Sequence, residues 1–405
     1  MKKILKYTGI VVGSILVVCA ILIAFNFNKV VRLYRVVTLF NEDVVVENFS
    51  NMNSIGLPIM EIKRTGPVFE FKRSPKPLPD FYDYKGEKRK SGELLTRTRT
   101  TALLVSKGDV ITFEKYYLGT AENDRRISWS VAKSFLSAIF GIAVHEGHIP
   151  DLNAPVTEFV PELKGTGYDG VSIKNVLQMS SGVRFNENYG DFNSDINRMG
   201  RILALGGSFD EFAKTLENER KPGTFLHYVS IDTHVIGMVL RRATGQKISD
   251  YFYDKLWSKI GAESDIYYVT DSLGEPMVLG GLNMRTRDYA RFGRLYLNNG
   301  KWNGKQIIPF DWVRDSITPD APYLKPGVRK EADITLGYGY QWWIPENADQ
   351  EFMALGIYDQ FIYINQKAGV VIVKNSANLD FMENNFEPTT ETVEFFRAVV
   401  ASLSE

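Results

Sequence analysis

The segment F-L-S-A-I-F-G-I-A-V, residues 135–144, constrains the fold more than any other part of the chain, because its side chains are apolar on nearly every side of a helical wheel. Such a helix offers no face to water, so the sequence predicts a helix buried in the core. One charged residue, Lys133, stands at the mouth of this helix, within the stretch W-S-V-A-K-S. A charge at that position needs a physical explanation.

Lys133 and Ser130 are three residues apart, and residues at this spacing share a helix face, so the hydroxyl and the amine can meet. Burial lowers the pKa of a lysine by up to about 3–5 units, and a partly neutral amine can act as a base. Ser130 would lie in the first helical turn, where unpaired N–H groups favour negative charge. The pattern predicts an activated nucleophile. The alternative is that Lys133 reaches solvent along its apolar stem and that Ser130 only caps the helix.

Strand patterns occur near both ends of the chain, and helical patterns dominate between them. Alternating residues around Gly108 predict a β-hairpin at residues 101–117, and a second hairpin is expected at residues 353–376. This order predicts an α/β (α+β) domain at residues 96–405. In this domain an antiparallel sheet is flanked by helices, and a mostly helical region at about residues 145–275 is inserted into it.

Residues 9–25 are uncharged and apolar, and as a helix they would cross most of a bilayer. We expect a single transmembrane anchor here, in contact with membrane lipid. A cytoplasmic tail at residues 1–8 would precede it, and a juxtamembrane connecting segment with a strand or two, at residues 26–95, would follow it. A short charged tail favours retention inside the cell, which would place the large domain in the periplasmic or extracellular space. The alternative is a cleaved signal peptide, although the run has no clear small-residue cleavage site.

Charge and cysteine content exclude several classes of protein. The 48 Lys and Arg residues balance 48 Asp and Glu residues, so the chain has no basic field and no nucleic-acid partner is expected. Cys19 is the only cysteine, which excludes an intramolecular disulfide, a cysteine-rich zinc site and an iron–sulfur cluster. The four histidines form no H-E-x-x-H motif, and no metal is expected.

Motifs of other enzyme classes are weak or absent in the sequence. G-T-G-Y-D-G at residues 165–170 has dinucleotide-site spacing, but Pro161 and Lys164 stand where the required buried strand should be, so we interpret it as a turn. The chain has no G-x-x-x-x-G-K-[ST] phosphate loop, and no cofactor is expected. Because no serine has a G-x-S-x-G elbow, Ser130 with Lys133 is the best candidate nucleophile.

A nucleophile with a buried amine still needs a proton relay to its leaving group. The stretch K-P-G-T-F-L-H-Y-V-S-I-D-T-H supplies a candidate: Tyr228 and Ser230 follow a Pro-Gly turn and precede a helix that Asp232 could cap. The alternative is that Tyr228 only packs its ring and forms local hydrogen bonds.

In this order, the motifs resemble those of the serine β-lactamase and D,D-peptidase superfamily, especially its class C-like esterases and nylon-oligomer (6-aminohexanoate-dimer) hydrolases. The resemblance runs from about Thr101 to the C-terminus and implies a β-lactamase/transpeptidase-like fold. It rests on S-V-A-K, Y-V-S, G-I-Y-D-Q, L-Q-M-S-S-G-V and R-D-Y-A-R-F-G.

The resemblance implies a role for each matching residue. Ser130 would be the acylated nucleophile, Lys133 its base partner, and Tyr228 the acid/base that serves the leaving group and then the water. Which of Lys133 and Tyr228 takes the first proton stays open. The backbone N–H groups of Ser130 and of Ile357 would form the oxyanion hole, and Tyr189 in F-N-E-N-Y would contact substrate.

Departures from the family pattern affect the expected substrate. Where penicillin-recognising members carry K-T-G or H-T-G, this chain has G-I-Y, which removes the usual cationic partner of a substrate carboxylate. Tyr358 and Asp359 belong to this motif and, with Ser230, are expected to contact substrate. Asp359 is also expected to place a negative charge near the mouth of the site. Ser230 replaces an asparagine of the class C pattern and matches the esterase branch.

Three functions are therefore considered. The first is a membrane-anchored serine hydrolase, a carboxylesterase or amidase that cleaves a small ester or amide. The second is a penicillin-interactive D,D-peptidase or β-lactamase, and the third is a non-catalytic binding or sensor protein that keeps the fold.

Overall fold

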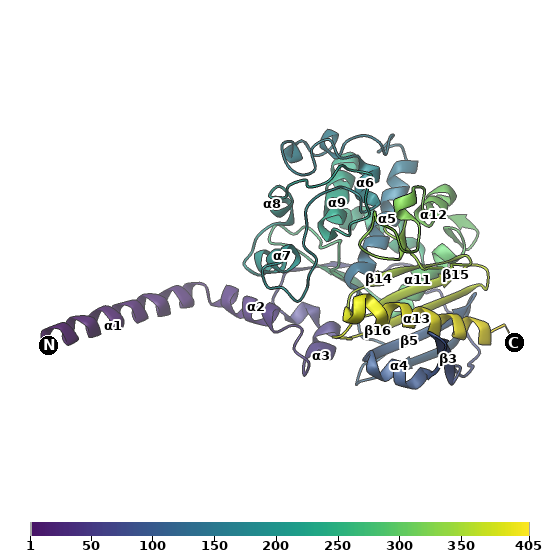
Figure 1. The fold of residues 1–405 in the computed structure, drawn as a ribbon, viewed down its shortest axis with the longest axis horizontal. Helices are drawn as coiled ribbons and strands as arrows, with labels where there is room; N and C mark the ends of the chain where they lie inside the picture. Colours follow the sequence, from purple (N-terminus) through teal and green to yellow (C-terminus); the bar gives the residue numbers. More distant parts are fainter. Residues whose placement is uncertain (1, 405) are drawn as a thin grey trace.

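The computed structural model describes residues 2–404, except for the side chains of residues 2–6, 19–24 and 385 (Figure 1). The helices are α1 (Lys2–Phe25), α2 (Phe27–Val37), α3 (Val45–Ser50), α4 (Ser91–Arg97), α5 (Ala132–His145), α6 (Ile173–Leu177), α7 (Asp195–Ala204), α8 (Phe209–Ala213), α9 (Ser230–Thr244), α10 (Ile248–Lys255), α11 (Thr286–Leu297), α12 (Phe310–Ser316) and α13 (Glu383–Ser402). The strands are β1 (Ile59–Ile62), β2 (Lys72–Arg73), β3 (Phe81–Tyr84), β4 (Glu87–Lys90), β5 (Thr100–Lys107), β6 (Val110–Tyr116), β7 (Arg126–Ile127), β8 (Ile266–Val269), β9 (Leu282–Met284), β10 (Lys301–Trp302), β11 (Lys305–Gln306), β12 (Gly337–Tyr338), β13 (Trp343–Ile344), β14 (Glu351–Gly356), β15 (Gln360–Asn365) and β16 (Val370–Ser376).

The main sheet has eight strands in the order β12-β13-β14-β15-β16-β5-β6-β2, and only the edge strand β2 is parallel to its neighbour. Early and late strands meet at its centre, where β16 pairs with β5. Long-range pairing of this kind places the two ends of the domain side by side. The predicted antiparallel sheet with helices around it is confirmed, and so is the hairpin formed by β5 and β6.

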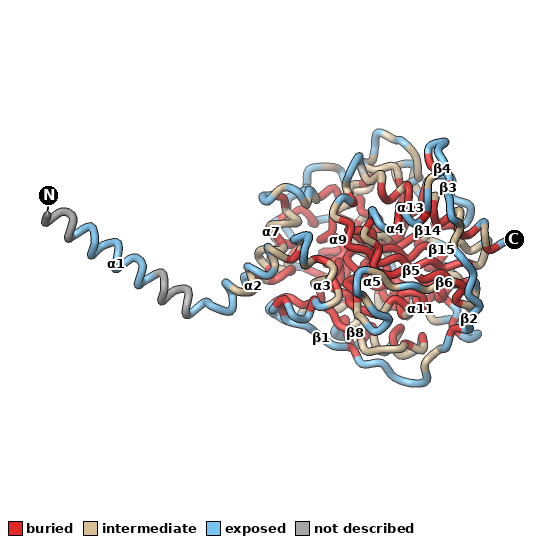
Figure 2. The backbone as a smooth tube through the Cα atoms, turned by 90° about the horizontal axis from the view of Figure 1, so that it is seen from below, coloured by how far each residue is buried: buried red, intermediate tan, exposed pale blue. Residues whose placement is uncertain are grey.

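Both faces of the main sheet are covered. Along β15, Ile362 and Ile364 point into one apolar core, while Phe361 and Tyr363 point into the other, because successive strand residues face opposite sides. Helix α11 packs against β16 and β15 on the first side. Helix α13 lies along the second side, where Phe396 contacts the rings of β15 (Figure 1). In the tube view, the buried residues gather in the central strands and in the helices packed on them (Figure 2).

Helix α5 lies inside the first core and is buried from Ala132 to Ala143, as its all-apolar sequence predicts. Its only glycine, Gly141, lies directly beneath the ring of Trp312 from α12. An ideal Cβ at Gly141 would lie 2.2 Å from Trp312 Cγ, so only a residue without a side chain allows this approach.

We expect Gly141→Ala to lower the free energy of unfolding by about 1–3 kcal/mol, because overpacking a well-filled core forces its neighbours to shift. Gly200 in α7 is the matched control, since a Cβ there meets no atom within 4 Å. Gly200→Ala should leave stability unchanged or raise it by up to about 1 kcal/mol through helix propensity. Urea denaturation followed by tryptophan fluorescence measures both variants. Equal stability of the two variants would contradict the packing account.

The N-terminal third holds more structure than the sequence predicts. Residues 26–95, expected to be a connecting segment with a strand or two, contain α2, α3, β1 to β4 and α4. Strand β1 joins β8, β9 and β7 in a second sheet, and Val45, Phe49 and Met52 are buried in the main core. The prediction was wrong here because the apolar side chains of this segment are buried against distant elements and show no sustained helical or strand period.

Helix α1 extends away from the body of the molecule (Figures 1 and 2). Part of the predicted anchor, residues 19–24, lies outside the described side chains. Within the described residues, none of the helices combines the length and the apolar composition needed to cross a bilayer.

Candidate active site

Ser130 lies in a short 3-10 turn, Trp129–Val131, that leads directly into α5. Trp129 has a positive φ of 43°, which is rare for a large residue and is found where the surrounding structure imposes it. Its ring is held by Phe40 and Phe49 of the N-terminal segment, with ring centroids 5.6 and 5.4 Å away. The residue before the candidate nucleophile is thus fixed by packing from a part of the chain distant in sequence.

Lys133 is buried one helical turn further on, with 2% of its surface exposed. Its Nζ donates to Ser130 Oγ at 2.8 Å and to the carbonyl oxygen of Leu279 at 2.6 Å. Burial lowers the pKa of Lys133 to about 7, and the negative charge of Glu187 opposes this shift. In a large fraction of the molecules, the Lys133 amine is therefore neutral at neutral pH. The alternative, that Lys133 reaches solvent, is wrong.

Tyr228 approaches the same pair from the segment that precedes α9. Its ring stacks on Trp343 at 5.2 Å, and Lys133 Nζ lies 5.2 Å from its centroid. Burial, followed by the charge of Glu187, raises the pKa of the Tyr228 phenol, although the nearby hydroxyls of Ser130 and Ser230 oppose this shift. Tyr228 is consequently a phenol that keeps its proton while Lys133 can lose its own. The predicted cap of α9 is wrong: Asp232 is buried in the first turn and accepts from Tyr168 Oη at 2.7 Å.

The end of β14 lies against the backbone around Ser130. An ideal Cβ at Gly356 would lie 3.1 Å from the Ser130 nitrogen and 2.6 Å from the Ser128 carbonyl oxygen, so a side chain at this position would prevent the approach. Ile357 follows at once and lines a cavity together with Ser130. The sequence places Ile357 on a strand; it lies in the turn between β14 and β15. The structure therefore brings the Ser130 and Ile357 backbones together.

Tyr358 and Asp359 continue this turn, with φ values of 60° and 62°. The prediction that Asp359 puts a negative charge near the mouth of the site is wrong, because its carboxylate is buried and lies 3.5 Å from Lys374 Nζ, while Asn378 Nδ2 donates to it at 2.9 Å. Tyr358 is likewise turned into an aromatic cluster and stacks on Phe40 at 5.1 Å. Neither residue lines the cavities beside Ser130.

Glu187 is a site residue that the sequence reasoning missed. One carboxylate oxygen accepts the Ser230 backbone N–H at 2.6 Å, and the other accepts Tyr189 Oη at 2.9 Å. Burial raises the pKa of Glu187, and the charge of Lys133 lowers it. Its proximity to Lys133 could have been suspected from the adjacent Tyr189, which the F-N-E-N-Y match already marked. Tyr189 and Ser230 are both hydrogen-bonded to this carboxylate, and both also line a cavity beside Ser130.

Two cavities meet at Ser130. The first, about 360 Å³, contains Tyr228, Glu187, His227 and Asp333 in its lining, and we call it the Tyr228 cavity. The second, about 380 Å³, is walled by α7, by residues 36–57 and by Leu279, and we call it the α7 cavity. Ser130, Tyr189 and Ile357 line both. Each volume is typical of a small-molecule site.

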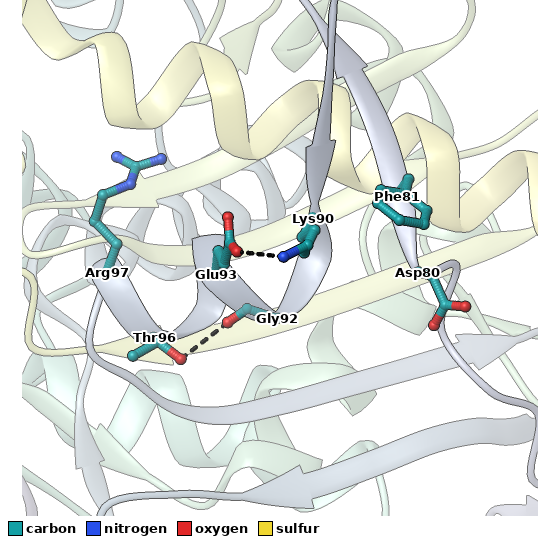
Figure 3. A pocket seen from close by; sticks show the side chains of 7 residues that line it. All are labelled: Asp80, Phe81, Lys90, Gly92, Glu93, Thr96 and Arg97. Atoms are coloured by element: carbon teal, nitrogen blue, oxygen red, sulfur yellow. Dashed lines mark hydrogen bonds and ion pairs between the residues drawn. The ribbon is translucent and has the colours of Figure 1, made fainter.

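A further hollow lies on α4 and the β3–β4 hairpin, away from Ser130 (Figure 3). Three of its charged side chains are held in ion pairs: Lys90 pairs with Glu93 at 2.9 Å, and Arg97 pairs with Glu391 of α13 at 2.5 Å. Nothing in this hollow resembles the buried Ser130 and Lys133 pair.

The main sheet is packed on both faces by helices, and a Ser-x-x-Lys pair lies at the start of the buried helix α5. This combination defines a serine hydrolase of the β-lactamase type. The chain belongs to the Beta-lactamase family, which matches residues 92–386. It is 32% identical to the 6-aminohexanoate-dimer hydrolase of Paenarthrobacter ureafaciens over 291 residues, 70% of this chain and 74% of that protein. The resemblance stated from the motifs is confirmed.

Solved structures agree with this assignment. A Bacillus anthracis protein assigned to the 6-aminohexanoate-dimer hydrolases superimposes with a TM-score of 0.80 at 26% identity, over 90% of this chain and 96% of that one. EstCE1, a hydrolase with promiscuous acyltransferase activity, shares the fold with a TM-score of 0.59 at 13% identity, over 76% and 96% of the two chains.

Proposed function

We propose that the protein hydrolyses an ester or amide through an acyl-enzyme on Ser130, with Lys133 as the base and Tyr228 as the acid for the leaving group. The observation that carries this proposal is the 2.8 Å contact between Ser130 Oγ and an amine whose burial lowers its pKa to about 7. Because the Tyr228 pKa is raised, the phenol keeps its proton at neutral pH, and the neutral Lys133 amine is the base available for the first proton. The 6-aminohexanoate-dimer hydrolase relative supports an amide as one substrate class.

In the proposed reaction, Ser130 Oγ attacks the carbonyl carbon while its proton passes to Lys133. The backbone N–H groups of Ser130 and Ile357 stabilise the resulting oxyanion. Collapse breaks the bond to the leaving group, which receives a proton from Tyr228. Water then attacks the acyl-enzyme and gives a proton to the Tyr228 phenolate, while Lys133 returns its extra proton to Ser130 Oγ. The acid is released and all three side chains regain their starting states.

A labelling experiment tests this proposal. The purified protein is treated with a fluorophosphonate, and the modified peptide is located by mass spectrometry. In parallel it is assayed with p-nitrophenyl butanoate, the linear dimer of 6-aminohexanoate and a labelled penicillin. We expect labelling of Ser130 and ester turnover. Absence of labelling and of turnover in every assay would overturn the proposal, whereas penicillin labelling with D,D-peptidase turnover would support the alternative.

The pH dependence of kcat/KM should report the ionisation of Lys133. Only the neutral amine accepts the Ser130 proton, so kcat/KM for a neutral ester should rise with pH and level off above about 7. The charge of Glu187 raises the Lys133 pKa, so Glu187→Gln should move this rise to lower pH. Rates with p-nitrophenyl butanoate from pH 5 to 9 measure the shift. A rise that disappears in Glu187→Gln would instead assign the titration to Glu187.

We also propose that residues 9–25 anchor the protein in a membrane with the catalytic domain outside the cytoplasm. Support comes from the uncharged composition of this run and from the exposure of its described side chains, among them Ile10, Ile15 and Leu16. Fractionation of cells expressing the full chain tests the anchor, and a reporter fused after Glu405 tests the sidedness. Recovery of the full chain in the soluble fraction would contradict it.

A further inference from the structure

The α7 cavity is apolar over most of its surface. Its walls include Val36 and Val37 of α2, Ile55, Met199 and Leu203, and Ser130 also lines it. Residues 36–57, which form one wall, lie outside the part of the chain that the Beta-lactamase family matches. This wall is therefore added to the family domain by the N-terminal segment.

The position of Tyr228 assigns a chemical role to each cavity. The group that protonates the leaving group must lie beside it, and Tyr228 lines the Tyr228 cavity but not the α7 cavity. The leaving group therefore occupies the Tyr228 cavity, where Glu187 and His227 lie beside apolar side chains such as Leu336. The acyl group of the substrate must point the other way, into the α7 cavity.

We infer that the α7 cavity holds a linear aliphatic acyl chain, so that the substrates are medium- to long-chain acyl esters or amides. This inference rests on the proposed acyl-enzyme function. Ser130 Oγ would form a bond to the fatty-acyl carbon, the bond to the leaving alcohol or amine would break, and water would release the fatty acid. Apolar walls favour such a chain because each methylene leaves water on binding.

The outer end of this cavity also suits an aliphatic chain. Helix α2 follows α1 after Asn26 alone, and Val37 on α2, which lines the cavity, is 57% exposed. Phe192, in the loop before α7, is 65% exposed and lines the same cavity. These side chains offer an apolar entrance beside the N-terminal helix, where a chain held in a micelle or bilayer could pass toward Ser130.

A substitution that fills the cavity tests the inference. Gly200 lies in α7 and lines the cavity, and a Cβ there meets no atom within 4 Å, so we expect Gly200→Leu to add its side chain to the cavity wall. Gly92→Leu is the matched control, since Gly92 is also a helical glycine with open space around it, in the hollow of Figure 3. We would measure kcat/KM for p-nitrophenyl esters from butanoate to hexadecanoate with the wild type and both variants.

We expect the wild type to prefer dodecanoate over butanoate by roughly tenfold or more, since each buried methylene adds up to about fourfold. Gly200→Leu should lose roughly tenfold on dodecanoate while keeping its rate on butanoate, and Gly92→Leu should match the wild type. An unchanged labelling rate with a short-chain fluorophosphonate checks that Gly200→Leu keeps an intact site.

The outcomes separate this inference from the proposed function. Turnover of butanoate without any gain for longer chains would overturn the inference and leave the serine hydrolase proposal standing, and so would a Gly200→Leu variant with the wild-type chain-length profile. Absence of both labelling and turnover with every ester would overturn both proposals.

Discussion

Lys133→Met is expected to lower kcat/KM by roughly 1,000-fold or more for esters and amides alike, because general-base catalysis typically contributes about 10²–10⁴-fold. Methionine fills a similar volume but cannot accept the Ser130 proton. The fold should remain intact, since the change removes an amine that is costly to bury rather than one that stabilises the core. Steady-state kinetics and urea denaturation on the same preparation measure both effects.

The free energy of unfolding should depend on pH differently in the wild type and in Lys133→Met. The pKa of Lys133 falls from 10.5 to about 7 on folding, so between these values the unfolded chain binds more protons than the folded chain. Stability of the wild type should therefore increase with pH from about 7 to 10.5, and Lys133→Met should lack this increase. Ser130→Ala, which lacks the proposed nucleophile, gives the residual kcat/KM against which Lys133→Met is compared. A Lys133→Met variant whose kcat/KM is well above that of Ser130→Ala, or one that unfolds, would contradict the assigned role.

The sequence predicted the parts of the site that depend on local spacing. The apolar run predicted α5, and the i,i+3 spacing predicted the Ser130 and Lys133 contact, because a helix fixes that geometry. Tyr228 was identified through an ordered motif, and its place before a helix was correct. These features require no knowledge of which distant elements pack together.

The parts that failed depend on tertiary packing. The turn at residues 357–359 was hidden because its left-handed residues are Tyr358 and Asp359 rather than glycines, so the chain read as one strand. Asp359 was expected at the site mouth, but strand register places Lys374 beside it. A buried ion pair of this kind cannot be read from one strand alone.

Glu187 and the α7 cavity were missed for a related reason. Glu187 stands in a polar stretch that reads as a solvated loop, and only the fold brings it to Lys133. The cavity is formed by α2 and α7, which are more than 150 residues apart in the chain, as the bond between Arg32 and the Ala204 carbonyl illustrates. Its walls follow from docking of the N-terminal segment, which has no sustained periodicity.

Tyr228→Phe should separate amides from activated esters. An amine leaves poorly unless it is protonated, so loss of the phenol should lower amide hydrolysis by roughly 10²–10⁴-fold. A p-nitrophenolate leaves as an anion, so acylation by p-nitrophenyl butanoate should fall by less than about tenfold. We expect Lys133 and Ser130 to keep their contact in this variant, because the Lys133 amine donates directly to the Ser130 hydroxyl. The stacked ring on Trp343 is also retained, which preserves the packing of the cavity.

The acylation and deacylation steps can be observed apart in stopped flow. Because the same phenol is proposed to assist the hydrolytic water, Tyr228→Phe should give a rapid burst of p-nitrophenolate followed by a slow steady state, with the acyl group detectable on Ser130 by mass spectrometry. Trp343→Phe, which keeps an aromatic ring beside Tyr228, is the matched control and should not accumulate the acyl-enzyme. Equal losses on amides and activated esters, without a burst, would show that Tyr228 acts before the leaving group departs and would assign it the first proton instead.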